Sequence, residues 1–144
     1  MFTLEEQFIL SRRDLQIDSN LIKETMTYIT GRLKNLSSKY SVNIDVLCNI
    51  GENIIIKDID NSLTTIKFSL NDNCKDLTIS VDDGESVYGK VTVSNGEYNI
   101  RYINKPKKFD TLDFKNKSSF FLNKNDLVEL FFNTLTMNEK FLIK

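Results

Sequence analysis

Between residues 42 and 103 the chain reads VNIDVLCNIGENIIIKDIDNSLTTIKFSLNDNCKDLTISVDDGESVYGKVTVSNGEYNIRYI. Apolar residues recur there largely at every second position, which is the period of a strand with one buried face. Six such runs are separated by short groups of Asn, Asp, Gly and Glu, and most of these residue types favour turns. Every connection is too short for a crossover helix, so we predict an antiparallel meander of about six strands.

Two features of this stretch support the assignment. The pair Asn95-Gly96 is the strongest hairpin signal in the chain, since both residue types tolerate the positive φ of a tight two-residue turn. The first run alternates apolar side chains at four positions, namely Val42, Ile44, Val46 and Cys48. We therefore expect Cys48 to be a small buried hydrophobe, because two cysteines are too few for a disulfide scaffold and lack metal-ligand spacing.

Helical patterns lie on both sides of the predicted sheet. Upstream, six apolar residues recur at steps of three and four: Ile22, Met26, Ile29, Leu33, Leu36 and Tyr40. This stripe predicts a helix that starts at Asp18 or Ser19 and packs on the sheet, with a coiled-coil seam as the alternative. Thr3 and Glu6 form a capping-box pattern that predicts a short helix before it.

Downstream, Asn123 or Asn125 can begin a further helix whose apolar face is formed by Leu127, Leu130, Phe131 and Leu135. The predicted fold is therefore α+β, with an N-terminal helical segment, an antiparallel meander and a C-terminal helix. We expect residues 1–144 to form a single domain, because this length suits one core and no repeat or linker divides the chain.

The composition narrows the chemistry that the protein can perform. The chain has no His, which excludes Ser-His-Asp and Cys-His nucleophile systems and any His-ligated metal site. It also has no glycine-rich phosphate loop and no nucleophile elbow. Only carboxylate, Lys, Tyr or Cys chemistry remains open, so we expect a protein that is not an enzyme and that uses no cofactor or metal.

The hydropathy pattern predicts a cytoplasmic protein without membrane contact. No apolar run approaches the ~20 residues that span a bilayer. The first residues include Glu5 and Glu6, where a signal peptide needs positive charge.

Charge is distributed unevenly along the chain. Residues 45–85 hold nine acidic residues and three lysines. Because alternate turns of a meander meet at one end of the sheet, we expect five carboxylates to share a rim there: Asp58, Asp60, Asp82, Asp83 and Glu85. The rim is interpreted as a docking surface for a basic protein, with a hard-cation site or ordinary turn chemistry as alternatives.

Residues 104–124 are basic and include several Phe residues. One interpretation is a single-stranded nucleic-acid site that uses phosphate contacts and base stacking, built from Lys105, Lys107, Lys108, Phe109, Lys115 and Lys117. The other is a loop that folds back, with its Phe side chains in the core and its lysines paired with the acidic rim. The chain's net charge of −1 favours the second interpretation.

Phe131 and Phe132 are adjacent in the predicted C-terminal helix and therefore point about 100° apart. If Phe131 faces the core, Phe132 is partly exposed, either at the border of a wide buried face or in a docking patch or homodimer seam.

Three functions remain open. The first is a protein-binding inhibitor of the toxin-immunity or phage-encoded kind, which neutralises a basic protein such as a toxin or nuclease. The small size, the lack of catalytic side chains and a composition typical of AT-rich coding sequence suit it. The second is a single-stranded nucleic-acid binder, and the third is a carboxylate-dependent, metal-assisted enzyme.

Overall fold

The computed structural model describes residues 1–81 and 87–138 and confirms the α+β architecture. Its helices and strands are α1 (Leu4–Leu10), α2 (Ser19–Lys39), β1 (Asp45–Asn49), β2 (Asn53–Lys57), β3 (Leu63–Leu70), β4 (Asp76–Val81), β5 (Tyr88–Ser94), β6 (Glu97–Ile103), β7 (Lys117–Ser119) and α3 (Lys124–Met137). Two short 3-10 turns, η1 (Lys107–Phe109) and η2 (Leu112–Phe114), lie between β6 and β7.

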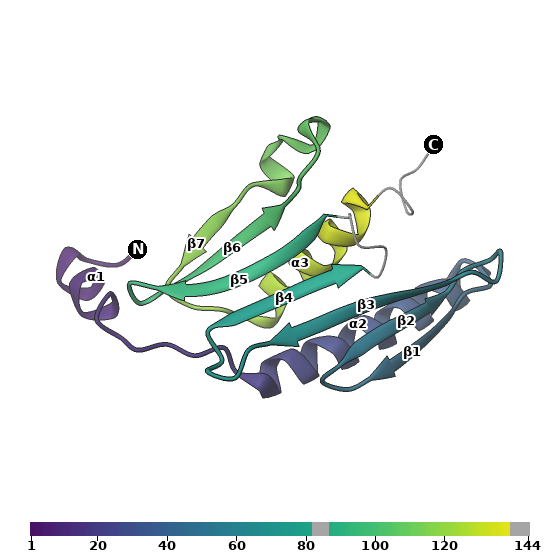
Figure 1. Cartoon of the computed structure of the whole chain (residues 1–144), viewed down its shortest axis with the longest axis horizontal. Helices are drawn as coiled ribbons and strands as arrows, with labels where there is room; N and C mark the ends of the chain where they lie inside the picture. Colours follow the sequence, from purple (N-terminus) through teal and green to yellow (C-terminus); the bar gives the residue numbers. More distant parts are fainter. Residues whose placement is uncertain (82–86, 139–144) are drawn as a thin grey trace.

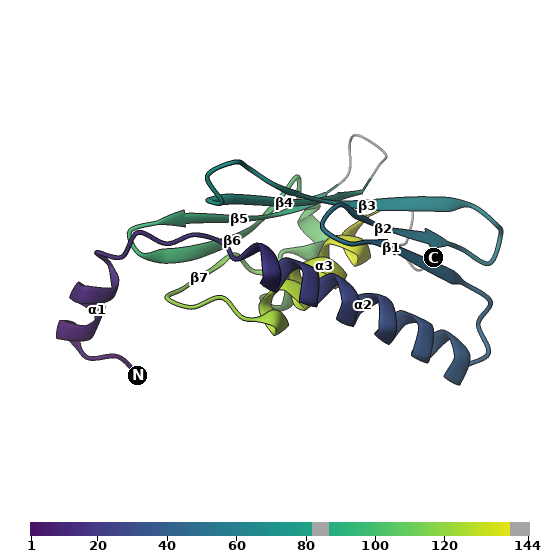
Figure 2. The same cartoon turned by 90° about the horizontal axis from the view of Figure 1, so that it is seen from below.

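The sheet is a seven-stranded antiparallel meander in which the strand order follows the chain order. Asn95 and Gly96 join β5 to β6 with φ of 54° and 70°, which is the left-handed backbone that the sequence predicts for this hairpin. Figures 1 and 2 show α2 and α3 on one side of the sheet, which we call the covered face. We call the opposite side, which none of the described helices covers, the open face.

The core lies between the covered face and the two helices. Alternate residues of the strands are buried there, including Ile54, Ile66, Leu77, Ile79, Val91 and Ile100. Phe131 of α3 stacks on Phe68 of β3 with ring centroids 6.0 Å apart. The helix α2 contacts β1 and α3, while α3 contacts β4 and β5, so the two helices share the sheet between them.

The predicted stripe of α2 is only partly buried. Asp18 caps the helix, and Ile22, Met26 and Ile29 are buried as expected. Leu33 and Leu36 are half-buried, and Tyr40 is 65% exposed, so the prediction of a buried stripe is wrong at its C-terminal end. The reason is visible in Figure 2, where the C-terminal end of α2 lies farther from the sheet than its middle.

Of the other local predictions, those of the helix caps are confirmed, whereas two details of β1 are wrong. The capping box of Thr3 and Glu6 is formed, and Asn123 caps α3. The first strand begins at Asp45 and not at residue 42, and Cys48 is half-buried where a buried side chain was expected. The strand β7 was not predicted, and it pairs with β6 from Tyr98 to Ile100.

Candidate protein-docking surface

The turn between β2 and β3 holds the described part of the predicted acidic rim. Its two carboxylates bind their own turn: Asp58 Oδ1 accepts from the Ile59 amide at 2.7 Å, and Asp60 Oδ1 accepts from the Ser62 amide at 2.9 Å and the Ser62 hydroxyl at 2.6 Å. Turn chemistry therefore accounts for an Asp at both positions. An ionised carboxylate has about four acceptor positions, so the turn hydrogen bond does not use the full acceptor capacity of Asp58.

The other three predicted members, Asp82, Asp83 and Glu85, lie outside the described residues. Strand β4 ends at the same end of the sheet as the 58–62 turn, as the meander requires. Val81 is paired there with Ile66, and residues 63–65 pair with β2.

An apolar patch lies on the open face beside this turn. Leu47 pairs directly with Ile55, and Leu63 pairs with Lys57 two residues along β2, so the three apolar side chains are neighbours across β1, β2 and β3. Leu47 is 58% exposed and Leu63 is 60% exposed, while Ile55 is half-buried. We call Leu47, Ile55 and Leu63 the β1–β3 patch.

A groove of about 440 Å³ runs past this patch. Besides the patch, its walls include Lys34 of α2, Asp45 and Lys57. A smaller polar notch beside it is formed in part by Asp45, Asp58 and Asn61. Apolar side chains thus lie at the centre of this surface and charged side chains at its border, the arrangement found in protein interfaces.

The sequence contains an indication of this patch, although the alternation of apolar residues in the strands does not reveal it. Leu47 and Leu63 occupy positions of the open face, where their neighbours along the same strands are Asp45, Asn49 and Thr65. An apolar residue in the polar register of a strand is not needed for the core. Such residues are candidates for a contact with another molecule.

In the basic segment 104–124, Phe109 and Phe114 face the core, whereas Phe121 is 52% exposed. Phe109 and Phe114 contact each other edge to face at 5.0 Å and pack against the core. Phe109 is half-buried, whereas Lys107, Lys108 and Lys115 are exposed. The role of Phe109 in base stacking stays a prediction. The segment thus keeps exposed positive charge, while two of its rings contribute to packing.

Two lysines of the segment bind acceptors close to it. Lys105 Nζ donates to the Phe114 carbonyl at 3.2 Å and reaches Asp110 at 3.5 Å. Lys117 Nζ lies 3.3 Å from Asp126 and 3.8 Å from Glu129 of α3. Both groups of contacts lie away from Asp58 and Asp60. Pairing of the lysines with Asp82, Asp83 and Glu85 concerns residues outside the described ranges and stays a prediction.

Phe132 is half-buried and packs against the core, with its ring edge to face against Phe131 at 5.1 Å. It lies at the border of the α3 core face, and its exposed part is smaller than those of Leu47 and Leu63.

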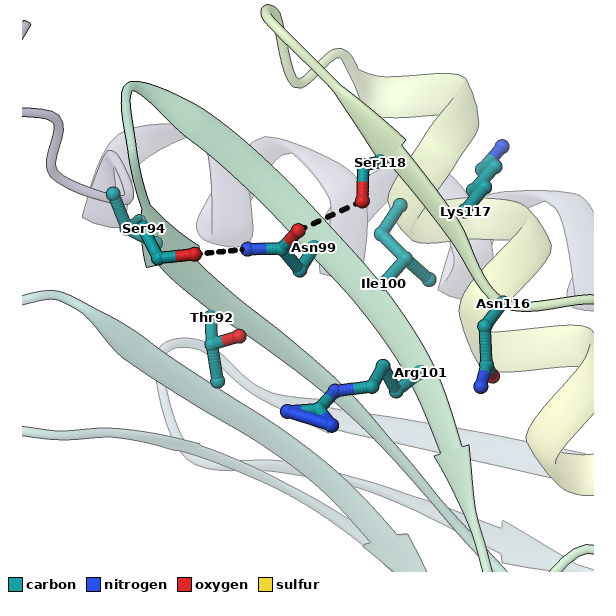
Figure 3. Close-up of a pocket in the computed structure, with 9 residues that line it drawn as sticks. Thr92, Ser94, Asn99, Ile100, Arg101, Asn116, Lys117 and Ser118 are labelled. Carbon is teal, nitrogen blue, oxygen red and sulfur yellow. Dashed lines mark hydrogen bonds between the residues drawn. The ribbon is translucent and has the colours of Figure 1, made fainter. Parts of the chain in front are cut away.

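A polar trough crosses the open face of β5, β6 and β7, with a volume of about 620 Å³ (Figure 3). In it, Asn99 Nδ2 donates to Ser94 Oγ at 2.9 Å and accepts through Oδ1 from Ser118 Oγ at 2.7 Å. Arg101 also lines the trough. The described lining of the trough consists of hydroxyl and amide side chains, Val93, Ile100 and the cations Arg101 and Lys117, so the trough offers hydrogen bonds and positive charge.

The described residues contain no group of three or more carboxylates or thiols that could hold a metal ion. Among residues 1–81 and 87–138, no helix is both long enough and apolar enough to cross a membrane. Burial raises the pKa of Tyr102, a core residue. Comparisons with protein-family models, with curated proteins and with solved structures find no match to this chain.

Proposed function

We propose that this protein is a non-catalytic binding module that docks a protein partner on its β1–β3 patch and the adjoining acidic turn. The observation that carries the proposal is the exposure of Leu47 and Leu63 on a face where packing against the core requires no apolar residue. Burying these side chains against a partner would remove apolar surface from water, which is the main favourable term in most protein association.

The charged border specifies the partner further. On the side of the β2–β3 turn, Asp45 and Asp58 line the polar notch beside the apolar centre, together with Lys57. Carboxylates at the border of an interface speed the approach of a basic partner more than they strengthen the final complex. The partner that fits is therefore a basic protein with apolar side chains among its positive charges.

The biological role that follows is inhibition, in the manner of an immunity protein or antitoxin. A basic surface on a toxin or nuclease is commonly the surface that meets nucleic acid, so an acidic binder covers it. Such a module needs no chemistry of its own, consistent with the absence of His from the chain. A gene for a basic toxin or nuclease next to the gene of this protein would supply the candidate partner.

Photocrosslinking in the source cells tests the proposal. The photoreactive amino acid p-benzoylphenylalanine replaces Leu47, Leu63 or, as a control on the open face of β4, Thr78. We expect a covalent adduct with one basic protein from positions 47 and 63 and none from position 78. Absence of adducts at 47 and 63, or equal adducts at 78, would contradict the proposal.

Once the partner is purified, two variants separate the apolar centre from the charged border. Replacing both Leu47 and Leu63 with Asp should weaken the complex by at least about 100-fold, because the centre of an interface carries most of its affinity. Asp58→Asn together with Asp60→Asn should instead slow association about three- to tenfold and reduce its salt dependence. Because the amide oxygen of Asn can accept the same turn hydrogen bonds, the double variant should keep the wild-type fold. An unchanged fold is therefore the control for this variant.

A further inference from the structure

The short helix α1 stands apart from the layers of the fold. Figures 1 and 2 show it at the end of the molecule opposite β1, beyond the hairpin of β5 and β6 and away from α2 and α3. It has seven residues and none of them is buried. Its capping box is complete, with the Thr3 amide donating to Glu6 Oε1 at 3.0 Å and the Glu6 amide donating to Thr3 Oγ1 at 3.1 Å.

The position of α1 is nevertheless fixed by the residues that follow it. Arg13 donates through Nη2 to the carbonyl oxygens of Gly96, at 3.0 Å, and Phe120, and through Nε to that of Leu10 at 3.2 Å. Gly96 packs so closely that a Cβ atom there would lie 2.0 Å from the Leu10 oxygen. An isolated helix of this length is unstable in water, so these contacts hold α1 in place.

The outer face of α1 is apolar. Phe8 is 57% exposed and Ile9 is 65% exposed. A groove of about 420 Å³ lies between α1 and Phe121 and is lined mainly by apolar atoms, with Glu5 and Glu6 at its border. A rigidly held helix that leaves its apolar face in water is typical of an interaction surface.

The charges of α1 indicate what occupies this surface. Glu5, Phe8 and Ile9 follow the spacing i, i+3 and i+4, which places them along one face of α1. Arg12 lies in the turn that follows the helix. The Arg12 guanidinium lies over the Phe8 ring, 4.6 Å from its centroid. Neither Glu5 nor Arg12 forms an ion pair with any described residue. The face therefore runs from a negative end through an apolar centre to a positive end.

Such a face is complementary to a second copy of itself. When two copies meet about a two-fold axis with their helices antiparallel, Glu5 of each lies opposite Arg12 of the other, and the apolar centres meet. We propose that α1 is a self-association surface through which two copies of this chain pair antiparallel, with the Phe121 grooves accepting the partner's apolar side chains. Because α1 and the β1–β3 patch lie at opposite ends of the molecule, the pair presents two outward docking surfaces.

The expected association is weak and reversible. Two seven-residue helices and a few aromatic side chains form a contact smaller than the ~1,200 Å² of standard protein interfaces. Sedimentation velocity on the full chain, from about 5 µM to about 500 µM, should show a monomer that shifts to a dimer as the concentration rises. A monomer throughout this range overturns the proposal.

Two sets of variants locate the contact. Ile9→Glu should abolish the dimer, whereas Leu63→Glu, an equally exposed site at the far end of the molecule, should leave it intact. Glu5→Arg and Arg12→Glu should each weaken dimerisation at least about fivefold, because each places like charges opposite one another. The double variant Glu5→Arg, Arg12→Glu should restore the dissociation constant to within about threefold of the wild-type value.

Circular dichroism melts verify that each variant is folded, since all four positions are exposed. A dimer that survives Ile9→Glu, or a double variant that fails to restore pairing, overturns the proposal. A dimer lost with Leu63→Glu would assign self-association to the β1–β3 patch and overturn it equally. The crosslinking experiment at positions 47 and 63 identifies the protein in the adduct and does not depend on dimerisation through α1. Failure of the docking proposal is therefore distinguishable from failure of the self-association proposal.

Discussion

The covered and open faces of the sheet are built from the same seven strands but are constrained differently. Along β4, Leu77, Ile79 and Val81 are buried, while Thr78 and Ser80 between them remain partly open. On the covered face, packing against α2 and α3 dictates the size and polarity of each side chain. On the open face, packing dictates little about the side chains. Ser, Thr, Lys and Asn are therefore ordinary there, whereas the exposed Leu47 and Leu63 indicate a contact with another molecule.

The largest expected contrast lies between adjacent residues of β4. Ile79→Ala should lower the free energy of unfolding by about 2–5 kcal/mol, because Ile79 is fully buried and its truncation leaves a cavity. Thr78→Ala, one residue along on the open face, should change it by less than about 1 kcal/mol. Urea or guanidinium melts measure both values, and similar costs at the two positions would remove the distinction between the faces.

A smaller contrast concerns two glycines. Gly89 of β5 lies under α3, and a Cβ atom there would meet Leu130 Cδ1 and Thr134 Oγ1 at 2.7 Å. Gly89→Ala should therefore destabilise the protein by about 1–3 kcal/mol through overpacking. Gly31 of α2 has no atom within 4 Å of that position, so Gly31→Ala should stabilise by about 0.5–1 kcal/mol through helix propensity. If both substitutions changed the free energy of unfolding in the same direction in these melts, the packing of α3 on Gly89 would be contradicted.

The smallest effect is a pH dependence at the border of the covered face. Burial raises the pKa of Tyr102 above its usual 10.0, a hydrogen bond from Asn133 opposes the shift, and Glu129 adds to it. A raised pKa means that the folded protein favours the neutral phenol. This contribution to stability is complete below pH 10 and is lost as the pH rises through the folded pKa.

Tyr102→Phe should remove that alkaline loss at a cost of about 1 kcal/mol near neutral pH, where the Asn133 hydrogen bond is lost. Unfolding midpoints of the wild type and of Tyr102→Phe, measured between pH 8 and pH 11, give the contribution of Tyr102 as their difference. The other tyrosines are present in both proteins, so their contributions cancel in this difference. Parallel curves across this range would show that Tyr102 titrates as it does in the unfolded chain.

The period of two in the sequence was sufficient for the meander, because alternation and short turns leave few other topologies. The sequence was not sufficient for β7, since residues 117–119 are Lys, Ser and Ser and all three are exposed. That strand depends on the free edge of β6, where Asn116 Oδ1 also accepts from the Tyr102 amide at 3.1 Å. Edge pairing leaves no apolar signature for sequence analysis to find.

The candidate site was harder to predict than the fold. The alternation identified the turn that holds Asp58 and Asp60, and the capping hydrogen bonds of these residues agree with the turn-chemistry alternative. It did not identify Leu47 and Leu63, because strand periodicity describes the face that packs and treats the other face as solvent. The exposure of α1 could not be predicted either. A sequence can indicate an amphipathic helix, but it does not show whether another part of the protein covers the apolar face of that helix.

The contacts of Arg13 have a consequence for the order of folding. Each strand pairs with its neighbour in the chain, so hairpins such as β5–β6 close over short loops and can form early. Arg13, by contrast, joins segments separated by 83 and 107 residues, and it meets both acceptors only after β5, β6 and the link to α3 are in place. Its interactions therefore belong to the native side of the folding barrier, where they retard unfolding without accelerating folding.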